Sequence, residues 1–189
     1  MSKPLDDATL AAVLLRPLQP AQVTLAEYDP DWPRRYERRA GELREALGDR
    51  LLSVDHIGST SVPGLAAKPV VDIMVSVADP EDEAAYLAEL TALGYRLSAR
   101  EPGHRCLRGF DPEEPVNLHV YAPGHVELAR CLAFRDRLRA SAADRERYEA
   151  VKRELAQREW RDMNYYAEAK RPVIFEVLAA AGWQEPAES

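Results

Sequence analysis

The sequence lacks long apolar runs, paired cysteines and an excess of positive charge, and each absence argues against a class of protein. The 189 residues contain no stretch of about 18 consecutive apolar side chains and no basic N-terminal segment followed by an apolar core, so we expect neither a membrane span nor a signal peptide. Cys106 and Cys131 belong to no CxxC pair or Cys/His array, which favours reduced, buried thiols. The net charge of −7 argues against general nucleic-acid binding. We expect a cytoplasmic protein with one well-buried core.

The most informative segment is a polar loop between two apolar runs of strand length. Residues 51–57 and 70–77 are rich in β-branched and aliphatic side chains, and the loop between them holds two glycines, two prolines and three hydroxyl residues. Backbone N–H groups and hydroxyls of such a loop bind anions, and Asp72, early in the next strand, is placed to hold a divalent cation. The pattern indicates a nucleoside triphosphate site. The candidates for phosphate binding are Gly58, Ser59, Thr60 and Ser61, and Asp72 is the candidate ligand of Mg²⁺ or Mn²⁺.

Two common catalytic motifs are absent from this loop. Five residues separate Gly58 from Gly64, and Lys68 follows Gly64 by four positions, so the GxxxxGK[ST] pattern fails. The hydroxyl residues also lack a GxSxG context. A P-loop kinase and a serine hydrolase are therefore disfavoured.

Hydrophobic periodicity predicts the remaining elements. The clearest helix lies within residues 31–48, with Pro33 in its first turn and Gly48 at its end. Further helices are predicted over residues 5–15, 79–94, 126–140, 144–158 and 170–181. Strands are predicted over residues 22–28, 51–57, 70–77, 95–99, 105–110 and 116–121, with an extended linker at 16–21.

The order of these elements predicts an α+β fold. Too few crossover helices separate the later strands for a doubly wound parallel sheet. We expect a mixed β-sheet flanked by helices, followed by a C-terminal helical extension. The predicted division is an N-terminal helix and linker at 1–21, an α/β core at 22–125, and helices at 126–189 that pack on the core to form a single domain overall.

Several separated motifs resemble the GrpB family and occur in the same order. They lie at His56 to Leu65, Lys68-Pro69, Asp72-Ile73, Asn117 to Val120, Phe134 to Arg139, Tyr148 to Lys152, and Lys170. The match spans roughly residues 28 to 180. The resemblance implies the nucleotidyltransferase-like fold of the polymerase-β superfamily and a relation to the domain appended to dephospho-coenzyme A kinase in some bacteria.

The superfamily pattern is only partly present. Its enzymes use three carboxylates to hold two Mg²⁺ ions that neutralise the triphosphate and activate the attacking hydroxyl. Here Ile57-Gly58-Ser59 and Asp72 match the pattern, but Met74 stands at the second acidic position. The third acidic position falls near Asn117 or His119. The usual two-metal route is therefore in doubt.

Two histidines are candidates to replace the missing charge. Asp72 and His119 lie on predicted strands, and His56 ends the strand that enters the polar loop. If their faces coincide, the three side chains converge, and they are then candidate catalytic residues or transition-metal ligands. The alternative is that each histidine hydrogen-bonds a neighbour in a polar core.

Basic residues in the family-like motifs are candidates to clamp a triphosphate. Arg135 and Arg139 stand four apart on one predicted helix, and Tyr148 and Lys152 do so on the next. The alternative is a solvated helix face. The full set of candidates is Lys68, Arg105, Arg135, Arg139, Tyr148, Lys152 and Lys170.

Two functions of different classes follow. The first is an enzyme that binds a nucleoside triphosphate and transfers a nucleotidyl or phosphoryl group to an unknown small-molecule or protein acceptor. The second is a nucleotide- or coenzyme-A-related binding module in which catalysis has been lost. Met74 favours the second, whereas Gly58, Ser59, Asp72 and the basic residues favour the first.

Overall fold

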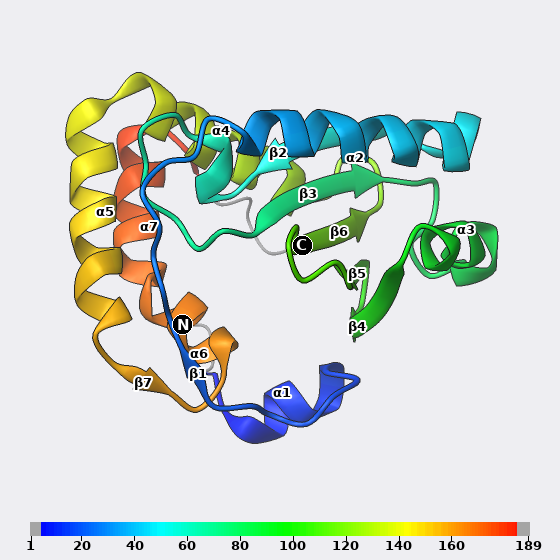
Figure 1. The fold of residues 1–189 in the computed structure, drawn as a ribbon, viewed down its shortest axis with the longest axis horizontal. Coiled ribbons are helices and arrows are strands. Elements are labelled where there is room, and N and C mark those ends of the chain that lie inside the picture. The colour runs from blue at the N-terminus through cyan, green and yellow to red at the C-terminus, as the bar shows by residue number, and fades with distance from the viewer. Residues whose placement is uncertain (1–4, 185–189) are drawn as a thin grey trace.

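The computed structural model describes residues 5–184 and has a five-stranded mixed sheet at its centre (Figure 1). The sheet contains β2 (Ser53–Ile57), β3 (Val71–Ser76), β4 (Tyr95–Glu101), β5 (His104–Gly109) and β6 (Val116–Tyr121). The strands lie in the order β2-β3-β6-β5-β4, with β3 and β6 parallel and the other neighbours antiparallel. The predicted α+β class with a mixed sheet is confirmed.

One face of the sheet packs against α2 (Trp32–Leu47) and α3 (Leu87–Ala92) (Figure 1). Side chains alternate between the faces of a strand, so Ile73 of β3 and its partner Leu118 of β6 both point to this face. They form the main apolar core together with Leu43 of α2 and Leu90 of α3. The centre of this face is therefore apolar and covered by helices.

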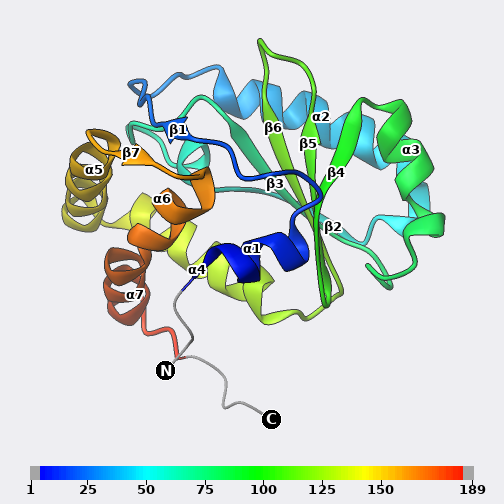
Figure 2. The same cartoon turned by 90° about the horizontal axis from the view of Figure 1, so that it is seen from below.

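The opposite face carries polar side chains at the ends of three neighbouring strands. Asp72 of β3 pairs with Asn117 of β6, which pairs in turn with Arg108 of β5, so all three point to the same face. Farther along the strands, this face is covered by α4 (Val126–Ala140), where Leu128 packs in a cluster with Met74. Figure 2 shows α1, α4 and α6 on this side of the sheet. The polar end of the face is left open for a site.

The other C-terminal helices stand beside the sheet and fix the polar loop (Figures 1 and 2). They are α5 (Ala142–Ala156), α6 (Met163–Ala169) and α7 (Arg171–Ala180). Val62 and Leu65 of the loop are buried against Tyr148 of α5 and Val173 of α7. Because these apolar side chains anchor it on the helices, the loop is held between the sheet and the C-terminal helices.

A segment at the N-terminus, residues 5–22, links the far edge of the sheet to the C-terminal helices; we call it the N-terminal strap. It contains α1 (Asp7–Val13) and β1 (Ala21–Gln22). Leu14 forms a bridge with Ala99 of β4, and β1 pairs with β7 (Glu159–Trp160). Arg16 donates hydrogen bonds of 2.7 and 3.1 Å to the carboxylate of Asp162, just before α6. The strap is therefore fixed at both ends.

Three predictions of local structure are wrong. Residues 22–28 contain no strand beyond Gln22, although Ala26 forms an isolated bridge with Ala67. The predicted helix at 79–94 is reduced to a 3-10 turn at Glu83–Ala85 and the short α3. No helix is predicted at α6, where the structure has one. Among residues 5–184, no helix has both the length and the apolar character that crossing a membrane requires.

Candidate functional site

The polar loop and β3 bring a glycine turn against the carboxylate of Asp72. Gly58 follows β2 with a φ of 68°, a left-handed conformation that favours glycine. A Cβ atom at this position would collide with Oδ2 of Asp72. Gly58 is thus required by both its backbone conformation and the close approach of the carboxylate. The turn continues as a 3-10 segment, Ser59–Ser61, in which Ser61 Oγ donates a 2.6 Å hydrogen bond to the carbonyl oxygen of Gly58.

Met74 occupies the second acidic position of the superfamily pattern, and Asn117 is, with His119, one of the two candidates for the third. The side-chain amide of Asn117 donates a 2.8 Å hydrogen bond to Oδ1 of Asp72. Met74 is fully buried in an apolar cluster with Ile57 and Tyr121. Asp72 therefore has a neutral hydrogen-bonding partner on one side and no second carboxylate two residues along its own strand.

Beside Asp72 lies a cavity of about 260 Å³ between the sheet, the polar loop and the C-terminal helices. Nine of the sequence-predicted site residues line it. They are Gly58, Ser59, Thr60, Lys68, Asp72, His119, Tyr148, Lys152 and Lys170.

Lysine is concentrated at this cavity. The chain has four lysines, of which Lys68, Lys152 and Lys170 line the cavity, and Lys3 lies outside the described residues. Lys152 is 2 % exposed, and its Nζ donates to Ser59 Oγ at 3.2 Å and to the carbonyl oxygen of Ala66. The Nζ atoms of Lys68 and Lys170 lie 5.7 and 4.8 Å from the centre of the Tyr166 ring.

The three ammonium groups form no direct ion pair in the described chain, although the charge of Asp72 acts on Lys68 and Lys170 and that of Glu149 on Lys152. Among residues 5–184, none of them forms an ion pair with a carboxylate, and Asp72 is the one carboxylate that lines the cavity. Burial lowers the pKa of all three lysines, and that of Lys152 falls to about 7, with the charge of Lys170 adding to the effect. An anion in the cavity would restore the charged forms and neutralise the excess positive charge.

Several cavity residues were missed by sequence reasoning. Arg108 lies on the same face as Asn117, and strand alternation from the His119 position would have selected it. Met163, Asn164 and Tyr166 come from α6. The available signal for α6 was Asp162, an N-cap residue whose carboxylate accepts from the N–H of Asn164.

The predicted convergence of His56 with Asp72 and His119 is wrong. His56 pairs with Ile73 in the antiparallel β2–β3 ladder and therefore points to the α2 face, opposite to Asp72. Its ring stacks on Tyr36 of α2 at 4.7 Å between centroids, and its Nε2 lies 3.0 Å from Thr60 Oγ1. Burial lowers the pKa of His56 to about 4, and Arg139 and Arg135 add to the effect. His56 supports the loop from the other side of the sheet.

His119 reaches the cavity and belongs to a hydrogen-bonded chain. Its Nδ1 lies 3.1 Å from Nε2 of His104, and Nδ1 of His104 lies 2.6 Å from a carboxylate oxygen of Glu101. Burial lowers the pKa of His119 to about 4, which makes the ring neutral at pH 7. With His56 on the other face, the hypothesis of a His-Asp-His metal site is wrong.

Arg135 and Arg139 of α4 contact the outer side of the polar loop and do not line the cavity. Arg135 donates a 3.1 Å hydrogen bond to the carbonyl oxygen of His56, and Arg139 donates two, of 2.9 and 2.7 Å, to that of Ser61. These contacts position the loop backbone. Ser61 likewise faces away from the cavity, since it is 3 % exposed and is absent from the cavity wall.

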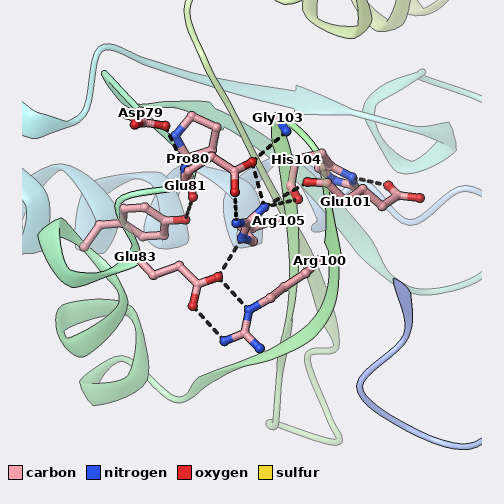
Figure 3. Close-up of polar contacts among 10 residues, drawn as sticks. Asp79, Pro80, Glu81, Glu83, Arg100, Glu101, Gly103, His104 and Arg105 are labelled. Carbon is pink, nitrogen blue, oxygen red and sulfur yellow. Dashed lines mark hydrogen bonds and ion pairs between the residues drawn. The ribbon is translucent and has the colours of Figure 1, made fainter. Parts of the chain in front are cut away.

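Arg105 lies on the α2 face and is fully engaged elsewhere (Figure 3). Its guanidinium contacts Glu81 and lies 2.6 Å from Glu83, which also binds Arg100 at 2.7 Å. These arginines lower the pKa of Glu83 to about 2, with the hydrogen bond from Arg100 as the largest cause. The expectation that Arg105 faces the loop is therefore wrong.

In the described part of the chain, Asp72 is the one carboxylate at the cavity that is available to a divalent cation. No group of three or more His, Cys, Asp or Glu side chains in the described part of the chain is arranged to hold a metal ion. Mg²⁺ commonly combines one or two carboxylates with waters and phosphate oxygens, so Asp72 suits one ion shared with a ligand. A two-ion centre does not fit, because Met74 and Asn117 supply no carboxylate.

The fold and the cavity define an α+β protein whose cationic site lies between a mixed sheet and a set of C-terminal helices. The family model described as GrpB protein matches residues 22–180, and the chain belongs to the GrpB family. The predicted resemblance is confirmed.

Three known proteins illustrate the relationship. A UPF0157 protein of Halalkalibacterium halodurans is 46% identical over 185 residues, which cover 95% of this chain and 94% of that protein. The crystal structure of conserved protein GrpB from Enterococcus faecalis has a TM-score of 0.71 and 32% identity, covering 85% of this chain and 100% of that one. A dephospho-CoA kinase of Mycolicibacterium paratuberculosis is 32% identical over 83% of this chain, which corresponds to 45% of that longer protein.

Proposed function

We propose that the cavity binds the triphosphate of a nucleotide and that the protein transfers a nucleotidyl or phosphoryl group from it to an acceptor. The observation that supports this most is the convergence of Lys68, Lys152 and Lys170 on the turn at Gly58, next to Asp72. Three unpaired ammonium groups match the multiple charges of a triphosphate. The dephospho-CoA kinase relatives add support for a nucleotide- or coenzyme-A-related ligand.

The cavity residues divide between phosphate binding and chemistry. Ser59 and Thr60 supply hydroxyls, and the lysines supply charge-assisted donors. Asp72 would hold one Mg²⁺ or Mn²⁺ ion, which when bound neutralises phosphate charge and polarises the bond that breaks. In the reaction an acceptor oxygen bonds either to the α-phosphorus, while pyrophosphate leaves, or to the γ-phosphorus, while the nucleoside diphosphate leaves. Neutral His119 is the candidate to take the acceptor's proton.

A second candidate function is a binding module without catalysis. The observations that favour it are the buried Met74 and the neutral Asn117 at positions where two-metal enzymes carry acids. The same phosphate contacts serve both functions, so binding alone does not separate them.

Replacing Asp72 with Asn tests the two functions against each other. For an enzyme, transfer of labelled nucleotide or phosphate should fall by at least ~100-fold, because the cation loses its charged ligand. For a binding module, Asp72→Asn should leave triphosphate affinity equal or slightly higher, because the removed charge repels phosphate. Melting temperature is the control for folding. Equal transfer rates in the wild type and the variant would exclude Asp72 as a catalytic metal ligand.

A further inference from the structure

A second cavity, of about 300 Å³, adjoins the lysine-lined one. The two share the wall residues Lys68, Val70, Arg108, Asn117 and Met163. Three other cavities of the described chain, near Tyr86, Phe110 and Glu149, share no wall residue with the lysine-lined cavity. A ligand that extends out of the phosphate site within the protein would therefore enter the second cavity.

The outer wall of this second cavity is the N-terminal strap. Arg16, Gln19, Pro20 and Ala21 line it, and all four precede residue 22, where the match to the GrpB family begins. The strap is held firmly, because Asp162 accepts hydrogen bonds both from Arg16 and from the backbone N–H of Gln19 at 3.0 Å. This wall is a fixed part of the cavity.

The two cavities differ in the chemistry of their walls. In the second cavity, apolar atoms form the larger part of the exposed wall, although as many polar side chains line it; the apolar side chains are Pro20, Ala21, Val70, Pro115, Val116 and Met163. Arg16 is already paired with Asp162, whereas Arg108 forms no ion pair with another described residue. Apolar walls with a few polar groups are typical of sites for small organic molecules, and a guanidinium stacks well on a flat aromatic ring.

We propose that the second cavity holds the nucleoside of the nucleotide, with the base against the apolar side chains and Arg108 between base and phosphates. This proposal rests on the proposed triphosphate site, because base and phosphates belong to one molecule. The N-terminal strap then forms the wall that contacts the nucleoside. The part of this wall formed by Pro20 and Ala21 lies outside the region matched by the family model, whereas Val116 and Met163 lie inside it.

The test fills the second cavity and compares two probes. Ala21→Trp places an indole in the cavity, whereas Gln22→Trp, the next residue of β1, adds the same bulk on an exposed position outside the cavity wall. Calorimetry with ATP, GTP, CTP and UTP should show roughly tenfold or greater loss of affinity for the preferred nucleotide in Ala21→Trp. Inorganic tripolyphosphate should bind to wild type and both variants within about twofold.

A second measurement uses the wild-type protein and so does not depend on whether Ala21→Trp folds. The chain has three methionines. Met163 lines both cavities, whereas Met74 is buried in the apolar cluster with Ile57 and Tyr121. With ¹³C-methyl methionine, the ring current of a base should shift the Met163 signal when the nucleotide binds, and tripolyphosphate should not reproduce that shift.

Each result supports or overturns a distinct statement. The nucleoside site is overturned if Ala21→Trp leaves nucleotide affinity unchanged. It is also overturned if tripolyphosphate and nucleotide shift the Met163 signal identically. Either result leaves the phosphate site intact. If neither tripolyphosphate nor any of the four nucleotides binds, the proposed function and this inference both fail.

Discussion

The arginines on the α2 face and the lysines of the cavity are both cations, but they stand in opposite electrostatic situations. Arg105 and Arg100 share Glu83, and Arg105 also contacts Glu81 (Figure 3). Lys68 and Lys170, by contrast, lie over the Tyr166 ring and form no direct ion pair with a carboxylate of the described chain, and the charge of Asp72 acts on both. A buried cation without a directly bonded counter-ion is costly for folding. Arg105 is a structural cation, whereas we propose that the lysines bind a ligand.

The largest effect should come from removing two cavity lysines together. Lys68→Met with Lys170→Met deletes two charge-assisted contacts, so triphosphate affinity should fall by at least ~100-fold. The matched control is Arg171→Met, which removes a cation next to Lys170 that pairs with Glu168 instead. Calorimetry with ATP and with tripolyphosphate measures the effect. If the control loses as much affinity as the double variant, the change in net charge alone explains the loss, and the cavity lysines have no special role.

Arg105→Met should have the opposite phenotype. Arg105 is 5 % exposed, and its loss removes its contacts with Glu81 and Glu83 while Glu83 keeps Arg100, so the unfolding free energy should fall by about 1 to 3 kcal/mol. Triphosphate affinity should stay within twofold, because the guanidinium lies on the other face of the sheet. Denaturant unfolding and calorimetry give the two quantities. If Arg105→Met lost triphosphate affinity but not stability, the contrast between Arg105 and the cavity lysines would be wrong.

Gly58→Ala tests the turn that brings loop and carboxylate together. The new Cβ must tolerate a φ of 68° and displace Asp72, so we expect roughly 1 to 3 kcal/mol of destabilisation. Gly64→Ala is the matched control, since Gly64 has a φ of 77° but no heavy atom near the added Cβ. Destabilisation beyond the control reports the approach of Asp72. Equal losses would assign the whole effect to backbone conformation.

The pH dependence of stability should reveal Lys152. Burial lowers its pKa from 10.5 to about 7 in the folded protein, so between these values the unfolded chain binds more protons than the folded one. Stability without ligand should therefore rise with pH across this window, by at most about 1.4 kcal/mol per pH unit from this residue. Lys152→Met should flatten that rise. Urea unfolding of both proteins at pH 7, 8 and 9 measures it, and parallel profiles would assign the slope to other groups.

Local patterns predicted much of this structure, and tertiary relations account for what they missed. The predicted spans of β6 and α4 agree with the structure, as does the amphipathic α2. Alternation within one strand explains why Asp72 and Met74 of β3 lie on the same face. The error at His56 arose between strands, because the β2–β3 register depends on how the long polar loop turns.

Partners distant in sequence explain the other differences at the site. Arg105 is one of many charged residues, and the amino-acid sequence alone does not show that the fold brings Glu81 and Glu83 into contact with it. The spacing of Tyr148 and Lys152 did indicate a shared helix face, and both line the cavity. The position of α6, which brings Tyr166 to the cavity wall, depends on contacts between distant segments, and hydrophobic periodicity does not predict such contacts.

Lysine-selective NMR tests the central claim most directly, because only four lysines contribute signals. With ¹³Cε/¹⁵Nζ labelling, the signals of Lys68, Lys152 and Lys170 can be assigned by single substitutions. Saturating tripolyphosphate should shift all three and raise the pKa of Lys152 above about 7, since the bound anion stabilises the charged form. The account would be contradicted if the three lysine signals and the pKa of Lys152 remained unchanged at saturating tripolyphosphate or ATP.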